Sequence, residues 1–174
     1  MHSPTTCPAE PNEVALGESA ITAEKSGLSM NTHFVSLGVM HGEAEFLVPR
    51  GFFTYRALDA PEMVESDSGR TLIRFGVMGL SVSMYLDKDS QEVLYGLSPG
   101  DVNIVNTSVS HFTQCILRLS DIFPFYDDDC DSDEWEVGAE KVEDVIREVD
   151  PSAYHEGSYW YEFRWDVTMG NFHG

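Results

Sequence analysis

The spacing of apolar residues changes once along this chain, and that change restricts the fold more than any other feature. From Leu80 to Leu86 apolar and polar residues alternate, which places Leu80, Val82, Met84 and Leu86 on one face of a strand. Beyond residue 106 the apolar residues recur about every three to four positions, the spacing of an amphipathic helix. Strands first and helices afterwards predict a single α+β domain, with helices packed on one face of a sheet.

Four strands with short connections are predicted in the middle of the chain. They cover residues 71–75, 80–86, 92–97 and 102–105. The connections are rich in Asp, Ser, Pro and Gly, which favour tight turns. Short connections join antiparallel neighbours, so we expect a mainly antiparallel meander of at least four strands. A further strand is expected in the second half of the apolar run Phe46–Leu58.

Three helices are predicted after the sheet. The first follows an N-cap within residues 106–108, the second ends at Asp150-Pro151, and the third begins near Ser158. Their apolar residues are Val109, Phe112, Ile116 and Leu119 in the first, Val142, Val145, Ile146 and Val149 in the second, and Trp160, Phe163 and Val167 in the third.

The N-terminal part of the chain gives weaker signals. Residues 1–27 are predicted to form a loose tail with a weak helix near 14–25, and residues 28–170 the α+β domain. A short helix is expected at the start of the domain, capped by Thr32 and ended by Gly38. Its apolar residues are Phe34, Val35 and Leu37.

The chain is strongly acidic. Among its 174 residues, 30 Asp and Glu against 10 Lys and Arg give a formal net charge of −20. A polyanion releases no counterions from nucleic acid and is repelled by anionic lipid, so we expect neither as a partner. The 10 Phe, 7 Tyr and 3 Trp supply a core, so the charge does not imply disorder. Such a charge favours a cationic partner or simply solubility.

The cellular location is inferred from the N-terminal residues, the apolar runs and the cysteine spacing. The first residues have neither the basic nor the apolar region of a signal peptide, and no apolar run approaches the roughly 20 residues that span a bilayer. Cys7, Cys115 and Cys130 are an odd number without repeating spacing, so no disulfide framework is expected. We therefore expect a cytoplasmic protein.

Four stretches in this order resemble one known family. They are a Leu-Gly turn within 32–39, hairpins over 73–97, a strand-to-helix joint at 104–112, and a helix, Asp-Pro and Trp pattern over 146–160. Together they resemble the SUKH superfamily, and within it the fourth group of bacterial immunity proteins. The resemblance spans about residues 32–168.

The resemblance implies a function. Such proteins are non-catalytic cytoplasmic antitoxins that bind and neutralise a secreted or polymorphic toxin domain, often a nuclease or deaminase. It implies a cognate toxin domain as the partner, which we expect to be basic, and no cofactor. Two alternatives remain open: a generic regulatory protein-interaction module, and a carboxylate- or metal-dependent hydrolase.

An acidic insert at residues 126–136 is the strongest candidate for the partner-binding site. Its predicted contact residues are Asp127, Asp128, Asp129, Asp131, Asp133, Glu134, Trp135 and Glu136. Packed carboxylates beside Tyr126 and Trp135 would imitate a phosphate backbone with stacked bases and attract the basic cleft of a nuclease. The other interpretation is a solvated, self-repelling loop between two helices.

Metal and nucleophile chemistry have weaker support. An EF-hand frame starting at Asp127 or Asp129 lacks the turn glycine, because its sixth position is Ser132 or Glu134, so loose divalent binding is the most this pattern supports. His111 and Cys115 share a helix face and would suit two zinc ligands or a Cys/His pair. No second ligand pair accompanies them, so a structural His and a buried Cys are favoured. We expect no metal and no catalytic residue.

The last predicted helix is rich in aromatic residues, namely Tyr159, Trp160, Phe163 and Trp165. At helical spacing such residues usually form core. The alternative is that some of them form a partner surface.

Overall fold

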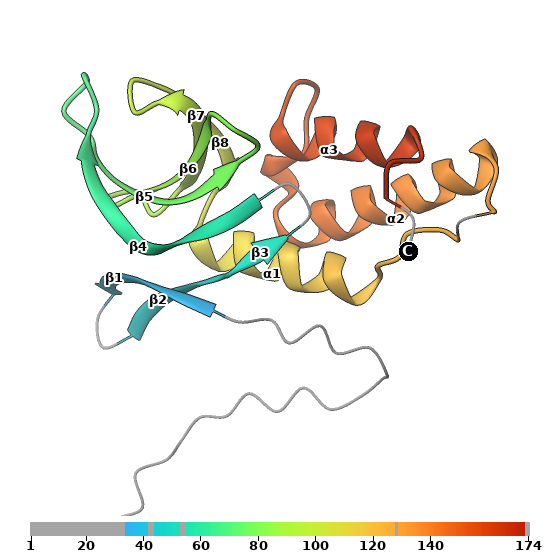
Figure 1. Cartoon of the computed structure of the whole chain (residues 1–174), viewed down its shortest axis with the longest axis horizontal. Coiled ribbons are helices and arrows are strands. Elements are labelled where there is room, and N and C mark those ends of the chain that lie inside the picture. Colours follow the sequence, from blue (N-terminus) through green and yellow to red (C-terminus); the bar gives the residue numbers. More distant parts are fainter. Residues whose placement is uncertain (1–33, 42–43, 53–54, 128, 173–174) are drawn as a thin grey trace, which may run out of the picture.

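The computed structural model describes residues 34–41, 44–52, 55–127 and 129–172. These residues form a series of strands followed by three α-helices and one short 3-10 helix, so the predicted α+β class is confirmed (Figure 1). The predicted tail and weak helix within residues 1–27 lie outside the described residues.

Six strands form one antiparallel sheet whose spatial order, β3-β4-β5-β6-β7-β8, is also their order along the chain. They are β3 (Gly51–Phe52), β4 (Tyr55–Glu65), β5 (Thr71–Met78), β6 (Val82–Asp87), β7 (Val93–Ser98) and β8 (Asp101–Asn106). The pairing register shifts within the ladders of β4 with β5, β5 with β6, and β7 with β8. Such irregularities bend strands, in keeping with the curled sheet in Figure 1. The predicted meander is confirmed and extends further toward the N-terminus.

The predicted short helix ending at Gly38 is wrong, because this segment is a strand. β1 (Phe34–His41) pairs antiparallel with β2 (Ala44–Pro49), and the register shifts between Ser36 and Met40. Gly38 has φ +66°, a value that suits an irregularity in a strand. Val35 and Leu37 lie two positions apart and pack toward the core, so the spacing fits a strand as well as a helix.

The prediction of a strand over the alternating segment 80–86 is correct except at its start. β6 begins at Val82, and Met84 and Leu86 are buried as predicted. Leu80 lies in the preceding turn and is fully exposed, so its placement on the core face is wrong. The turn follows Gly79, whose φ of +55° ends the extended run of β5.

The helices begin and end close to their predicted limits. They are α1 (Val109–Asp121), α2 (Ser132–Val149), the 3-10 helix η1 (Pro151–Ala153) and α3 (Tyr159–Thr168). The N-cap hydroxyls of Ser108 and Ser158 accept hydrogen bonds from the backbone N–H of His111 and Tyr161 at 3.1 and 3.3 Å. Pro151 ends α2 because it cannot donate a backbone hydrogen bond.

One hydrophobic core joins the sheet to the helices. The rings of Tyr55, Phe75 and Phe112 meet edge to face with centroids 5.6–6.0 Å apart, linking the sheet to α1. Within α3, Trp160 is completely buried and Phe163 nearly so. A separate small cluster of Leu72, Tyr85 and Leu94 also forms on the sheet. α2 and α3 pack directly against each other and lie side by side (Figure 1). The surfaces described next lie at these two helices.

Candidate partner-binding surface

The acidic insert begins with a buried aromatic residue. The Tyr126 hydroxyl donates a hydrogen bond to the Val167 carbonyl oxygen at 3.0 Å and accepts one from the Phe172 N–H at 2.8 Å. Both partners belong to the C-terminal part of the chain, so Tyr126 ties the insert to the end of α3. Its interpretation as an exposed imitation of a base is wrong, because the ring belongs to the core.

The second half of the insert is helical. Asp131 is the N-cap of α2, and its Oδ1 accepts hydrogen bonds from the N–H groups of Asp133 and Glu134 at 3.0 and 3.3 Å. Glu134 Oε2 accepts in return from the Asp131 N–H at 3.3 Å, which completes a capping box. The interpretation of the whole insert as a loop between two helices is therefore wrong, because α2 already begins at Ser132.

The structure brings most of the predicted partner-binding residues to the surface at one end of α2. Exposed carboxylates are Asp127, Asp129, Asp131, Asp133 and Glu134, while Trp135 and Glu136 are half-buried. Asp128 lies outside the described residues. Acidic side chains in the first turn also interact favourably with the helix dipole, so part of this charge stabilises α2 itself.

Trp135 and Glu136 contact other parts of the same chain. The rings of Trp135 and Tyr126 lie 6.2 Å apart, and Trp135 leaves no room for a side chain at Gly170. Both carboxylate oxygens of Glu136 accept hydrogen bonds from the Arg164 guanidinium. These two residues therefore hold α2 against the C-terminal part of the chain.

A shallow pocket of about 230 Å³ lies beside the exposed carboxylates. Asp127 and Glu134 line it together with Val137, which is 50% exposed, and Lys141. Cys130 also lines it, and desolvation with a hydrogen bond to Glu134 raises the pKa of its thiol. Carboxylates beside apolar atoms suit a long cationic side chain, whose stem packs while its head stays charged.

His111 and Cys115, the candidate zinc or nucleophile pair, lie in α1 and are separate from this surface. Cys115 is completely buried, and desolvation raises the pKa of its thiol to about 12, so a thiolate does not form at neutral pH. The interpretation of Cys115 as a buried core residue is confirmed. Across the part of the chain that the structure describes, no three His, Cys, Asp or Glu residues are grouped so as to hold a metal ion.

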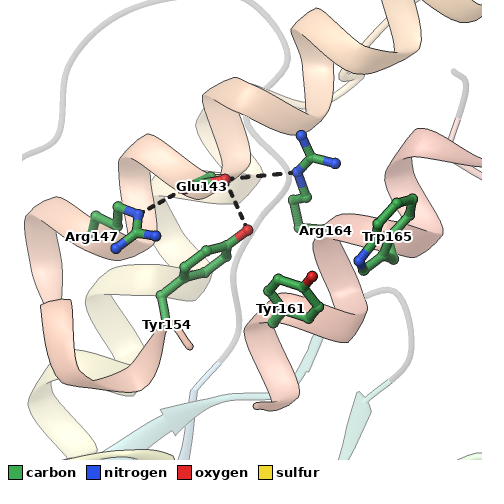
Figure 2. A pocket seen from close by; sticks show the side chains of 6 residues that line it. All are labelled: Glu143, Arg147, Tyr154, Tyr161, Arg164 and Trp165. Carbon is green, nitrogen blue, oxygen red and sulfur yellow. Dashed lines mark hydrogen bonds and ion pairs between the residues drawn. The ribbon is translucent and has the colours of Figure 1, made fainter. Parts of the chain in front are cut away.

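Sequence reasoning missed a second pocket, which lies between α2 and α3 (Figure 2). It has a volume of about 270 Å³ and is lined by Glu143, Arg147, Tyr154, Tyr161, Arg164 and Trp165. Glu143 lies between the two arginines, as Figure 2 shows: its oxygens contact Arg147 Nε at 2.7 Å, Tyr154 Oη at 2.9 Å and Arg164 Nε at 3.8 Å. We call this the α2–α3 pocket.

The ionisation of the α2–α3 pocket follows from these contacts. Burial alone would raise the pKa of Glu143, but hydrogen bonds from Arg147 and Tyr154 outweigh it and lower the pKa. Burial and the Glu143 carboxylate raise the pKa of Tyr154 to about 12. At neutral pH Glu143 is therefore a carboxylate whose oxygens both accept from the chain's own donors.

The aromatic residues of α3 gave the one sequence signal for this pocket. Tyr159, Trp160 and Phe163 are buried, as the core interpretation predicts. Trp165 is 47% exposed and lines the pocket, which fits the alternative of a partner surface.

Comparison with known proteins gives one result. The family model of the SUKH-4 immunity proteins matches residues 31–166, well over half of the chain. The chain belongs to the SUKH-4 immunity protein family. No curated protein and no solved structure matches the chain.

Membership in the SUKH-4 family indicates a role in toxin immunity, with a cognate toxin as partner. The match confirms the resemblance noted from the sequence and contains both the acidic insert and the residues of the α2–α3 pocket. Among the described residues, no helix has the length and apolar character that crossing a membrane would require.

Proposed function

We propose that this SUKH-4 protein is a cytoplasmic antitoxin that binds one cognate toxin domain and blocks it without catalysis. The family match over residues 31–166 is the observation that carries the proposal. The proposed toxin is a basic domain that acts on nucleic acid, such as a nuclease or a deaminase. A basic active-site cleft is the complement of a chain with a net charge of −20.

Tyr55, Cys115 and Tyr154 are not activated for nucleophilic chemistry. The hydroxyl of Tyr55 and the thiol of Cys115 both have raised pKa values because they are desolvated, which keeps them neutral and unreactive. Tyr154 likewise stays protonated and donates to Glu143. A tyrosine or cysteine that acts as a nucleophile needs the opposite displacement, toward a pKa near neutral pH.

We place the first contact with the toxin on the exposed acidic end of α2. The proposed contact residues are Asp127, Asp128, Asp129, Asp131, Asp133 and Glu134, with Trp135 and Glu136 at the edge of the surface. Exposed charges of this kind chiefly accelerate association, because they steer an oppositely charged partner at long range. The pocket lined by Asp127, Glu134, Val137 and Lys141 would accept a lysine or arginine of the toxin, because its two carboxylates outnumber its one ammonium group.

Co-expression with a candidate toxin tests this function. The toxin domain encoded beside this gene should arrest growth when expressed alone, and growth should return when this chain is co-expressed. With purified proteins, toxin activity should fall to zero at one equivalent of the chain. Unrelieved growth arrest with no complex on gel filtration would refute the proposal. Inactivation of many toxin molecules by one chain would instead reveal an enzyme.

A further inference from the structure

The α2–α3 pocket differs in electrostatic character from the rest of this acidic protein. It is lined by two arginines and one glutamate, whereas α2 and α3 otherwise carry exposed acids such as Glu140, Asp144 and Asp166. Arg147 is paired with Glu143 and Arg164 with Glu136, so this pocket is close to neutral and repels a carboxylate less than the acidic surface around it. Its unpaired hydrogen-bonding groups determine which occupant it favours.

The unpaired groups of the pocket are mainly donors, although the Tyr161 hydroxyl can also accept. Within the described part of the chain, Arg147 makes a hydrogen bond through Nε alone. Its side chain is 51% exposed, and its guanidinium carbon lies 4.5 Å from the centroid of the Tyr154 ring. The Tyr161 hydroxyl and the Trp165 indole N–H form no hydrogen bond with any described residue. Arg164 is used internally, because Glu136 and Thr168 accept from its terminal nitrogens.

A cationic occupant is disfavoured by the same contacts. Both oxygens of Glu143 already accept hydrogen bonds, so an incoming lysine or arginine would be repelled by two guanidinium groups and would compete with Arg147 for that carboxylate. An apolar occupant would desolvate the terminal nitrogens of Arg147 without replacing their hydrogen bonds with water, which is costly. A carboxylate satisfies these donors, because the guanidinium fork binds it through two parallel hydrogen bonds.

We propose that the α2–α3 pocket receives an aspartate or glutamate side chain of the cognate toxin and thereby sets the register of the complex. This inference rests on the proposed antitoxin function and adds a second, directional contact to it. A diffuse acidic surface attracts any basic protein in many orientations. One carboxylate held by Arg147 at one end of the pocket, with the exposed ring of Trp165 packed against the toxin at the other end, selects a single orientation and partner (Figure 2). Trp, Tyr and Arg are also the residues most often dominant in protein interfaces.

The kinetics of Arg147→Met against the toxin test this proposal. Removing a positive charge makes the chain more negative, so long-range attraction to a basic toxin should not weaken. The pocket contact predicts that dissociation nevertheless becomes about tenfold faster or more, because a paired charge at an interface chiefly sets the dissociation rate. Trp165→Ala should accelerate dissociation as well.

Arg50→Met is the matched control. Arg50 has a similar side-chain exposure, 54%, and also pairs with one carboxylate, Asp59, but it lies at the sheet. It should leave dissociation unchanged. On the toxin side, each Asp and Glu is changed to Asn or Gln; one of these should reproduce the effect of Arg147→Met and add nothing to it in the double variant.

The outcomes separate this inference from the function on which it rests. A natural chain that fails to bind the toxin refutes both. Tight binding by the natural chain with unchanged dissociation for Arg147→Met and Trp165→Ala refutes the pocket contact alone. Self-association that Arg147→Met abolishes, with unchanged toxin binding, would assign the pocket to a second copy of this chain and refute the toxin carboxylate.

Discussion

The indole Nε1 of Trp160 donates a 3.0 Å hydrogen bond to Oδ1 of Asn106, and both side chains are completely buried. Asn106 Nδ2 in turn donates to Asp150 Oδ2 at 3.0 Å. The end of β8, the end of α2 and the first turn of α3 are thus joined through one amide. Both candidate surfaces depend on this joint, because it sets where α2 and α3 lie.

Asn106→Leu tests the importance of the joint. The substitution keeps the volume but leaves the indole N–H without its acceptor and removes one donor from Asp150. We expect a loss of about 2–4 kcal/mol in the free energy of unfolding, measured by urea denaturation. Asn103→Leu, at an exposed position of the same strand, should change it by less than about 0.5 kcal/mol. Equal effects would show that the buried network contributes little.

Acid should weaken the same joint through Asp150. Burial disfavours its charged form, but hydrogen bonds from the Thr107 N–H, Asn106 and Ser152 outweigh this and lower its pKa below the ordinary 3.8. The ionised carboxylate therefore stabilises the fold above about pH 4, and this contribution is lost as the pH falls through the lowered pKa. His111 Nδ1 lies 3.6 Å from Asp150 Oδ2.

Asp150→Asn isolates that contribution. The variant should be less stable by about 1–3 kcal/mol at pH 7, and the difference should narrow below about pH 4. Urea midpoints measured from pH 7 to pH 3 give the comparison. The exposed Asp144→Asn should follow the natural protein throughout. Parallel curves for Asp150→Asn and the natural protein would contradict the assignment.

The two tryptophans of α3 should behave differently. Trp160→Ala should cost about 3–5 kcal/mol of stability, because it removes a completely buried ring. Trp165→Ala should cost less than about 1 kcal/mol, because nearly half of its side chain is already in water. Thermal unfolding of the two variants measures this, and similar losses would mean that Trp165 is needed for the fold.

Neutralising the acidic insert should slow toxin association without weakening the fold. Asp127, Asp128 and Asp129 changed together to Asn should reduce the association rate several-fold at low salt and flatten its salt dependence. Stability should be unchanged or slightly higher, because like charges are removed. The control changes Glu65 to Gln, and Asp67 and Asp89 to Asn; these exposed acids lie at turns of the sheet. Stopped-flow rates that are the same for both triple variants would place the contact elsewhere.

The sequence alone was sufficient for elements whose signals are local. Alternation before residue 87 and helical spacing after residue 106 are short-range patterns, so the meander and three helices follow from them. Ser158, which caps α3, and Pro151, which ends α2, likewise affect only neighbouring residues in the sequence. The segment 34–41 escaped this reasoning, because Val35 and Leu37 fit either period and only pairing with β2 makes them a strand.

Tertiary structure decided which of the candidate residues reach a partner. Tyr126 lies in an acidic segment whose composition predicts exposure. Its hydroxyl nevertheless forms hydrogen bonds with Val167 and Phe172, which are distant in the sequence. The α2–α3 pocket contains Arg147, Trp165 and residues between them, and the aromatic residues of α3 alone do not predict that it forms. Propensity and periodicity act over a few residues, whereas burial and charge pairing depend on which helices pack together. The sequence therefore determined the elements with local signals, and the packing of α2 on α3 determined the surfaces.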